Sequence, residues 1–261
     1  LVTAAETTLA RGGDGAAAAT TAQVYNLVTR ALIKLRASGL EWISADRALR
    51  AAGQAEDALT LAEAQRLLGS VFRRAGHPDR AQTLTLQAAD QLDVTSRTAE
   101  PEALSLHGVL MCSAGYAAAR AGDRDRAADL LGEAQSTTER LGEHPVRQRA
   151  LAANVISHQV SAAYVLGDGG TALHHARGAD LRSFPTAERQ GRFLVDVALA
   201  FAQWNKPQQA YRVLLDAERR APGEVRTRSA ARGLVVDLLR DRRSSSLPGL
   251  RDLAVRTHAL A

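Results

Sequence analysis

The chain has 261 residues, of which 33 are basic and 28 acidic, giving a formal net charge of +5, and only 4% are aromatic. A single cysteine, Cys112, excludes an internal disulfide framework, and no apolar run approaches the roughly 18 residues that a membrane-spanning helix needs. Helix-forming Ala, Leu and Arg dominate, and β-branched runs are few. We therefore expect an all-α fold.

A pattern of small residues recurs four times along the chain. A Gly or Asn is followed five residues later by Ala, and seven residues after that by another Ala. The four sets are Gly76/Ala81/Ala88, Gly122/Ala127/Ala134, Gly167/Ala172/Ala179 and Asn205/Ala210/Ala217. Self-similarity at a period near 40 residues is typical of stacks of two-helix repeats, so each set predicts helix A, a turn and helix B.

The turns between the paired helices read AGHPDR, AGDRDR, LGDGGT and WNKPQQ. Gly or Asn can end helix A in the left-handed conformation, and Pro78 and Pro207 suit the first turn of helix B, where no amide donor is needed. The alanines are expected where the two helices cross closely, because a larger side chain there would force them apart.

The ends of the chain depart from the four regular copies. Residues 1–11 are expected to form the last helix of a preceding repeat, and a divergent first copy spans about 22–53, with Gly39 as its break. Residues 224–240 predict one amphipathic helix and 248–259 a short final helix. We therefore expect a repeat array, 1–223, of about five repeats plus a leading helix. Capping helices of the same domain, 224–261, cover the exposed end of the stack.

The regular copies resemble the tetratricopeptide repeat. Residues 67–89 match that pattern best, because Gly69, Phe72, Ala81 and Ala88 fall on its expected positions. The third copy keeps Gly115, whereas the fourth has Val160 in place of the helix-A glycine. The resemblance implies a right-handed α-solenoid whose A helices line an inner, concave surface.

Nearly the whole chain also resembles the C-terminal repeat region of actinobacterial transcriptional regulators of the Xre type. The segments that carry this resemblance are 22–35, 117–131, 154–173, 214–228 and 247–256. It implies a cytoplasmic homodimer that reaches DNA only through an upstream helix-turn-helix domain, absent from these residues. The first residue is Leu1 and the only methionine is Met111, so we expect the natural protein to continue upstream. This chain departs from those regulators at 144–153, a stretch that often contains Trp and Phe in them but has no aromatic Trp, Phe or Tyr here.

The sequence predicts neither an enzyme nor a metal or cofactor site. It has no HExxH, no paired Cys-x-x-Cys, no P-loop and no GxSxG elbow, and the Gly-rich segment 167–170 falls in a repeat turn. His174 and His175 are adjacent, so on a helix they point in different directions; His158 on the preceding helix could approach one of them. Cys112 is expected to be a buried small side chain.

Counting along each A helix from the repeat positions gives the side chains expected to line the groove. They are Asn26, Thr29, Arg36, Arg66, Ser70, Arg73, Cys112, Tyr116, Arg120, Asn154, Ser157, His158, Tyr164 and Arg192, with Ile33, Glu63, Val109, Ser161, Val195 and Leu199 beside them. Asn can donate to and accept from a peptide backbone, and Arg can clamp a carboxylate. Arg66, Arg73 and Arg120 together favour an anionic group on the ligand.

These residues lead to two hypotheses. The first is a sensor and dimerisation domain of a transcriptional regulator, binding a peptide or a small anionic effector in the groove. The second is a stand-alone scaffold that binds a segment of a partner protein there. They differ in what precedes Leu1, which is a DNA-binding domain in the first and further repeats in the second. Trp42 and Trp204 are expected to be buried packing residues.

Overall fold

The computed structural model describes residues 1–35, 39–96, 98–244 and 247–260. Within these ranges the chain forms fourteen α-helices and one 3-10 helix, with no β-strand, so the expected all-α fold is confirmed. It divides into two compact units, Leu1–Leu151 and Ala152–Ala261, which we call unit 1 and unit 2. The division falls inside helix α8 (Pro145–Val165).

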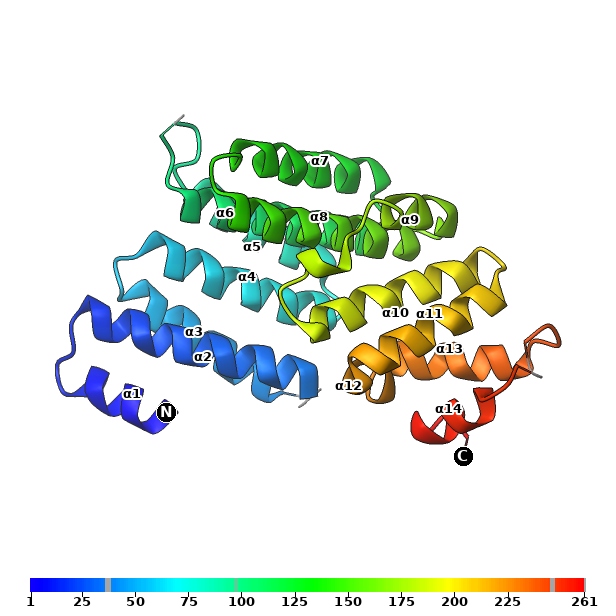
Figure 1. Cartoon of the computed structure of the whole chain (residues 1–261). Coiled ribbons are helices and arrows are strands. Elements are labelled where there is room, and N and C mark those ends of the chain that lie inside the picture. Colours follow the sequence, from blue (N-terminus) through cyan, green and yellow to red (C-terminus); the bar gives the residue numbers. More distant parts are fainter. Residues whose placement is uncertain (36–38, 97, 245–246, 261) are drawn as a thin grey trace. The chain divides into compact units, whose positions relative to one another are not determined.

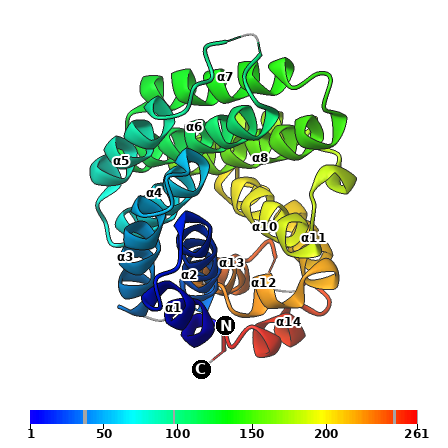
Figure 2. The ribbon, with the colours of Figure 1, turned by 90° about the vertical axis from the view of Figure 1, so that its left-hand side faces the viewer.

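Unit 1 is a stack of helix pairs (Figure 1). Its complete helices are α1 (Val2–Ala10), α2 (Gly15–Leu35), α3 (Leu40–Gly53), α4 (Ala58–Arg74), α5 (Pro78–Asp90), α6 (Pro101–Ala121) and α7 (Arg124–Arg140). The pairs α2–α3, α4–α5 and α6–α7 pack internally, and consecutive pairs meet through α3–α4 and α5–α6. The first helices of the pairs also meet, α2 with α4 and α4 with α6, and Figure 2 shows α1 and α7 at opposite ends of this stack.

Unit 2 is built around α10 (Figure 1). After the end of α8 its elements are α9 (Gly169–Ala176), the 3-10 helix η1 (Leu181–Ser183), α10 (Ala187–Gln203), α11 (Pro207–Arg220), α12 (Pro222–Arg226), α13 (Ser229–Arg240) and α14 (Leu250–Arg256). Residues 224–240, expected as one helix, are two, because Arg228 takes an extended backbone (φ −82°, ψ 127°). Val225, Leu234 and Leu253 share one apolar core with α10 and α11, so the C-terminal tail is part of unit 2.

The four predicted breaks all have left-handed backbones. Gly76 and Gly122 have φ of +88°, Gly167 has +84° and Asn205 has +59°. After each break the next N–H donates to the carbonyl five residues back; Asp123 N–H, for example, lies 3.0 Å from the oxygen of Ala118. This bonding closes the C-terminus of a helix, so the reason for Gly or Asn at these positions is confirmed.

The small residues inside the pairs lie where two helices nearly touch. A Cβ added to Gly69 would lie 2.8 Å from Thr85 Oγ1 and 3.3 Å from the carbonyl oxygen of Ala81. A Cβ on Gly115 would lie 2.9 Å from Leu131 and 3.3 Å from the carbonyl oxygen of Ala127. The expected close crossing is therefore confirmed in α4–α5 and α6–α7.

Several local expectations were wrong. Ala179 is partly exposed and lies beyond α9, which ends at Ala176 before the helix-breaking Gly178. The first pair begins at Gly15, seven residues earlier than expected. Trp204 is 48% exposed at the end of α10, because the left-handed Asn205 turns the chain away there. Trp42 is half-buried, with its ring centroid 4.9 Å from that of Phe72.

Candidate functional site

A glutamate shared by two arginines joins α2 and α4 in unit 1. Arg66 donates from Nε to Glu63 Oε2 at 2.6 Å and from Nη2 to Glu63 Oε1 at 2.8 Å. Arg30, one helix away on α2, also binds Glu63 Oε1 through its Nη2. Burial tends to raise the pKa of Glu63, but Arg66 and Arg30 outweigh burial and lower it to about 2. The carboxylate is therefore ionised at neutral pH.

The same side of α4 continues toward α6. Ser70 donates to the carbonyl oxygen of Arg66 at 3.2 Å, and the guanidinium of Arg73 lies 5.0 Å from the ring centroid of Tyr116 on α6. Arg120 follows Tyr116 by one helical turn and is exposed. We call Arg30, Glu63, Arg66, Ser70, Arg73, Tyr116 and Arg120 the α2–α4–α6 surface. It carries four arginines and one glutamate.

Three predicted groove residues of unit 1 face the helix packing. Thr29 is 0% exposed; its hydroxyl donates to the carbonyl oxygen of Tyr25 at 2.8 Å, and its Oγ1 lies 2.9 Å from Ser44 Oγ. Cys112 is also 0% exposed, as expected for a small core side chain, and Asn26 is 4% exposed. These three side chains present too little surface to contact a ligand, so their assignment to the groove was wrong. Arg36 lies outside the described residues.

In unit 2, α8 and α10 are joined by side-chain hydrogen bonds at three levels. Arg189 donates to Asn154 Oδ1 at 3.2 Å, Ser161 donates to Asp196 Oδ2 at 2.5 Å, and the Gln203 amide donates to the carbonyl oxygen of a residue on α8, Tyr164, at 3.0 Å. These bonds fix the two helices side by side along their length.

Of the predicted groove residues in unit 2, Asn154 is 9% exposed, and its amide oxygen accepts the hydrogen bond from Arg189. Ser157 and Tyr164 are partly exposed and Arg192 is exposed. His158 is also partly exposed, with its Nδ1 2.8 Å from the carbonyl oxygen of Asn154. Val195, expected inward beside them, is 0% exposed.

Two polar groups were missed by the sequence analysis. Arg30 lies one helical turn after Asn26, so helical spacing alone could have pointed to it. Asp196 lies one turn after Arg192 and joins α10 to Ser161, while the neighbouring Val195 faces the core. The side of α10 that contacts α8 therefore includes Asp196, one residue after the Val195 that the sequence analysis had placed there.

The described part of the chain shows no group of three or more His, Cys, Asp or Glu side chains placed to hold a metal ion. The rings of His174 and His175 have centroids 6.1 Å apart. None of its described helices combines the length and the apolar composition needed to cross a membrane.

Comparison with known proteins supports the fold only. No protein-family model matches the chain, and no curated protein sequence matches it significantly. The chain is similar to the crystal structure of BtubC (BKLC) from P. vanneervenii, with a TM-score of 0.52 and 16% sequence identity. The match covers 85% of this chain and 87% of that one. At this identity the similarity concerns the arrangement of helices.

Proposed function

We propose that this chain is a non-catalytic binding module whose α2–α4–α6 surface holds an acidic peptide segment or a small anionic effector. The observation that carries the proposal is the charge of that surface, four arginines against the single Glu63. Arg30 and Arg66 share this carboxylate, so the surface keeps an excess of positive charge. Anions are the ligands that such a surface attracts.

The arginines are also held in place before a ligand arrives. Arg66 is fixed by two hydrogen bonds to Glu63, and Arg73 lies against the ring of Tyr116. A guanidinium has five N–H donors in a rigid plane, so a paired or stacked arginine retains donors for a second carboxylate. Holding them in position lowers the entropy cost of binding.

The wider role that we propose is that of the sensor and dimerisation domain of a cytoplasmic transcriptional regulator. It is supported by the five sequence segments that resemble the repeat region of Xre-type regulators. In that role the chain forms a homodimer and meets DNA through another domain. The alternative is a scaffold that binds a partner protein's acidic segment on the same surface.

The binding step is tested with two fluorescent peptides, hexaglutamate and its neutral counterpart hexaglutamine, followed by anisotropy at low salt. We expect hexaglutamate to bind and the double variant Arg73→Gln/Arg120→Gln to weaken its binding about tenfold, since two charge-assisted contacts are lost. Arg80→Gln is the matched control, because Arg80 is exposed on α5, away from this surface. Equal affinities of the double variant and the control would contradict the proposal.

The wider role is tested on the protein isolated from its natural host. Its intact mass and N-terminal sequence show whether a helix-turn-helix segment accompanies these residues. A DNA-binding segment supports the regulator. A product close to 27.8 kDa without one favours the scaffold.

A further inference from the structure

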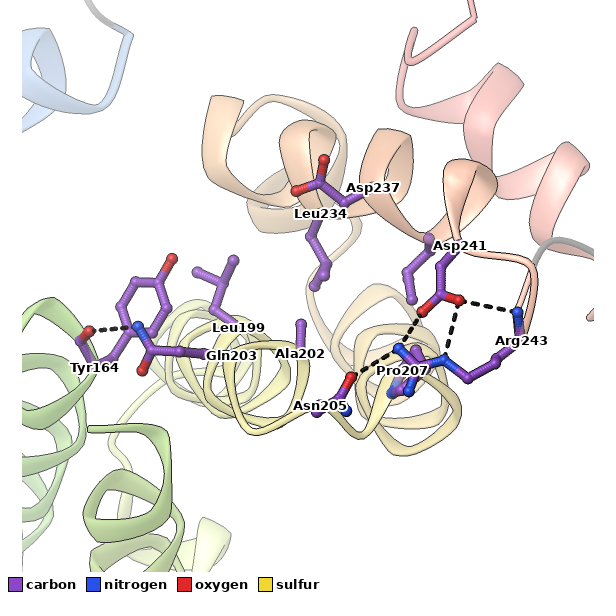
Figure 3. Close-up of a pocket in the computed structure, with 11 residues that line it drawn as sticks. Tyr164, Leu199, Ala202, Gln203, Asn205, Pro207, Leu234, Asp237, Asp241 and Arg243 are labelled. Carbon is purple, nitrogen blue, oxygen red and sulfur yellow. Dashed lines mark hydrogen bonds and ion pairs between the residues drawn. The ribbon is translucent and has the colours of Figure 1, made fainter. Parts of the chain in front are cut away.

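Unit 2 contains a pocket of about 340 Å³ (Figure 3), and of its lining residues only Tyr164 and Leu199 were among the side chains expected to line the groove. Its lining comes from the end of α8, the end of α10 with the turn after it, and α13. We propose that this pocket binds an aliphatic cation, an ammonium or guanidinium group carried on a short hydrocarbon stem. Such a group occurs in small amines and in lysine and arginine side chains.

One of the two carboxylates of the pocket is already neutralised. Arg243 donates to Asp241 through Nη2 at 2.8 Å, Nε at 3.1 Å and its backbone N–H at 2.9 Å. The same Nη2 donates to Asn205 Oδ1 at 2.7 Å, a bond drawn as a dashed line in Figure 3. The charge of Arg243 is thus fully engaged at one end of the pocket.

The second carboxylate, Asp237, lies one helical turn earlier on α13. Its side chain is exposed, and within the described residues its carboxylate makes no hydrogen bond or ion pair. Its situation is unusual, because unit 2 has 16 basic and 10 acidic residues, and six of the other acids pair with arginine, namely Asp180, Asp196, Asp216, Glu218, Glu224 and Asp241. With Asp241 cancelled by Arg243, the lining has a net charge of −1. This charge selects a cation.

The rest of the lining is suited to a hydrocarbon stem. Leu199, Ala202, Leu234 and Leu238 supply apolar side chains from α10 and α13. Figure 3 shows the Tyr164 ring beside Leu199. An aromatic ring also attracts a cation that passes over its face. The volume lies at the lower end of the range for small-ligand pockets, which suits a chain of about four or five carbons.

This site has the opposite charge preference to the α2–α4–α6 surface and belongs to the other unit. A negative result for one proposal therefore leaves the other unaffected.

The test is titration of the ¹⁵N-labelled chain with n-pentylammonium, with 1-pentanol as the neutral probe of the same shape. The indole N–H of Trp204 and the amides of 199–207 and 234–243 report on the pocket. We expect saturable shifts with the amine, and about threefold weaker binding of the alcohol and of the Asp237→Asn variant, because the exposed ion pair is missing in both. Asp252→Asn, an exposed carboxylate of α14 outside the pocket, should bind like the unaltered chain.

Equal binding of the amine and the alcohol, or full binding by Asp237→Asn, would overturn the proposal, since the pocket would then be only an apolar hollow. Ala202→Leu tests whether the two probes bind in this pocket, because a larger side chain in the lining should block the binding of both. The source of the cation is read from a second titration with N-acetyl-lysine amide. Tighter binding than that of pentylammonium supports a protein side chain, weaker binding supports a free amine, and the absence of binding by both overturns the site.

Discussion

Units 1 and 2 are built from the same kind of helix pair but carry charge in opposite ways. Unit 1 has 17 basic and 18 acidic residues, a net charge of −1, yet its α2–α4–α6 surface has an excess of arginine. Unit 2 has a net charge of +6, yet its pocket exposes the acid Asp237. The charge of a site thus depends on which charged side chains the fold brings together there, and net charge alone does not indicate the ligand.

Each unit also contains one glutamate shared by two arginines, and this common device allows a direct comparison. Glu63 joins α2 to α4, and Glu218 joins α11 to Arg226 of α12 and Arg256 of α14. Each unit has one tryptophan, so the variants Trp42→Phe and Trp204→Phe leave a fluorescence reporter in one unit at a time. Urea unfolding of these single-tryptophan chains then measures the units separately.

The largest effect is expected for Glu218→Gln. Glu218 is 7% exposed, and its two oxygens receive Arg226 at 3.0 Å and Arg256 at 2.8 and 2.6 Å. The substitution leaves two arginines without their counter-charge and should lower the free energy of unfolding of unit 2 by about 3 kcal/mol. Asp216→Asn on the same helix is the control, because its exposed ion pairs should be worth less than about 1 kcal/mol. Equal losses from both substitutions would contradict a special role for Glu218.

Glu63→Gln should lower the free energy of unfolding of unit 1 by about 2 kcal/mol, since its carboxylate is more exposed than that of Glu218. The pKa of Glu63 is lowered from 4.5 to about 2, so its contribution is complete above pH 4.5 and is lost as the pH falls toward 2. The unaltered unit should therefore lose more stability than the variant over that range, measured by urea unfolding with the Trp42 reporter. Asp46→Asn is the control, because Asp46 forms an exposed ion pair with Arg50. If Glu63→Gln loses as much unfolding free energy between pH 4.5 and 2 as the unaltered chain, Glu63 is not the group that causes the loss.

Part of this arrangement could be predicted from the sequence, and the reason is visible at the breaks. Gly122 and Asn205 have a positive φ, and few other residue types adopt it at low energetic cost. The breaks can therefore be recognised from the residue types in the sequence. The inward-facing side chains were harder to predict. In α6, 12 of 21 residues are buried, most of them Ala, Gly, Ser or Leu, so its pattern does not single out one face. Cys112 was therefore assigned to a groove from which it is excluded.

The next prediction concerns the helix breaks, which are Gly122 in unit 1 and Asn205 in unit 2. Gly122→Ala should destabilise unit 1 by about 1 kcal/mol, because Ala tolerates φ of +88° poorly and a Cβ there meets no atom within 4 Å, so the cost is that of the backbone alone. Gly122→Asn, which imitates Asn205 of unit 2, should cost less. Gly132→Ala, in the middle of α7 and equally open, should stabilise the helix by up to about 1 kcal/mol. The same sign for the two alanine variants would disprove this account.

The smallest effect separates the units by pH. In unit 1, burial lowers the pKa of His107 and Arg140 lowers it further, while Glu133 and Asp90 raise it less; Glu133 Oε1 lies 3.4 Å from His107 Nε2. In unit 2, burial and then His174 lower the pKa of His175, and Asp168 raises it less. A histidine whose pKa is lower when folded takes up its proton more readily when unfolded, so stability is complete above pH 6.5 and declines below it. His107→Gln should flatten this decline between pH 7.5 and 5 for the Trp42 reporter and leave the Trp204 reporter unchanged, with the converse for His175→Gln. Because His107 is 8% exposed and His175 only half-buried, the flattening should be larger in unit 1. If the urea midpoint of His107→Gln falls between pH 7.5 and 5 as far as that of the unaltered chain, His107 is not a source of the acid sensitivity.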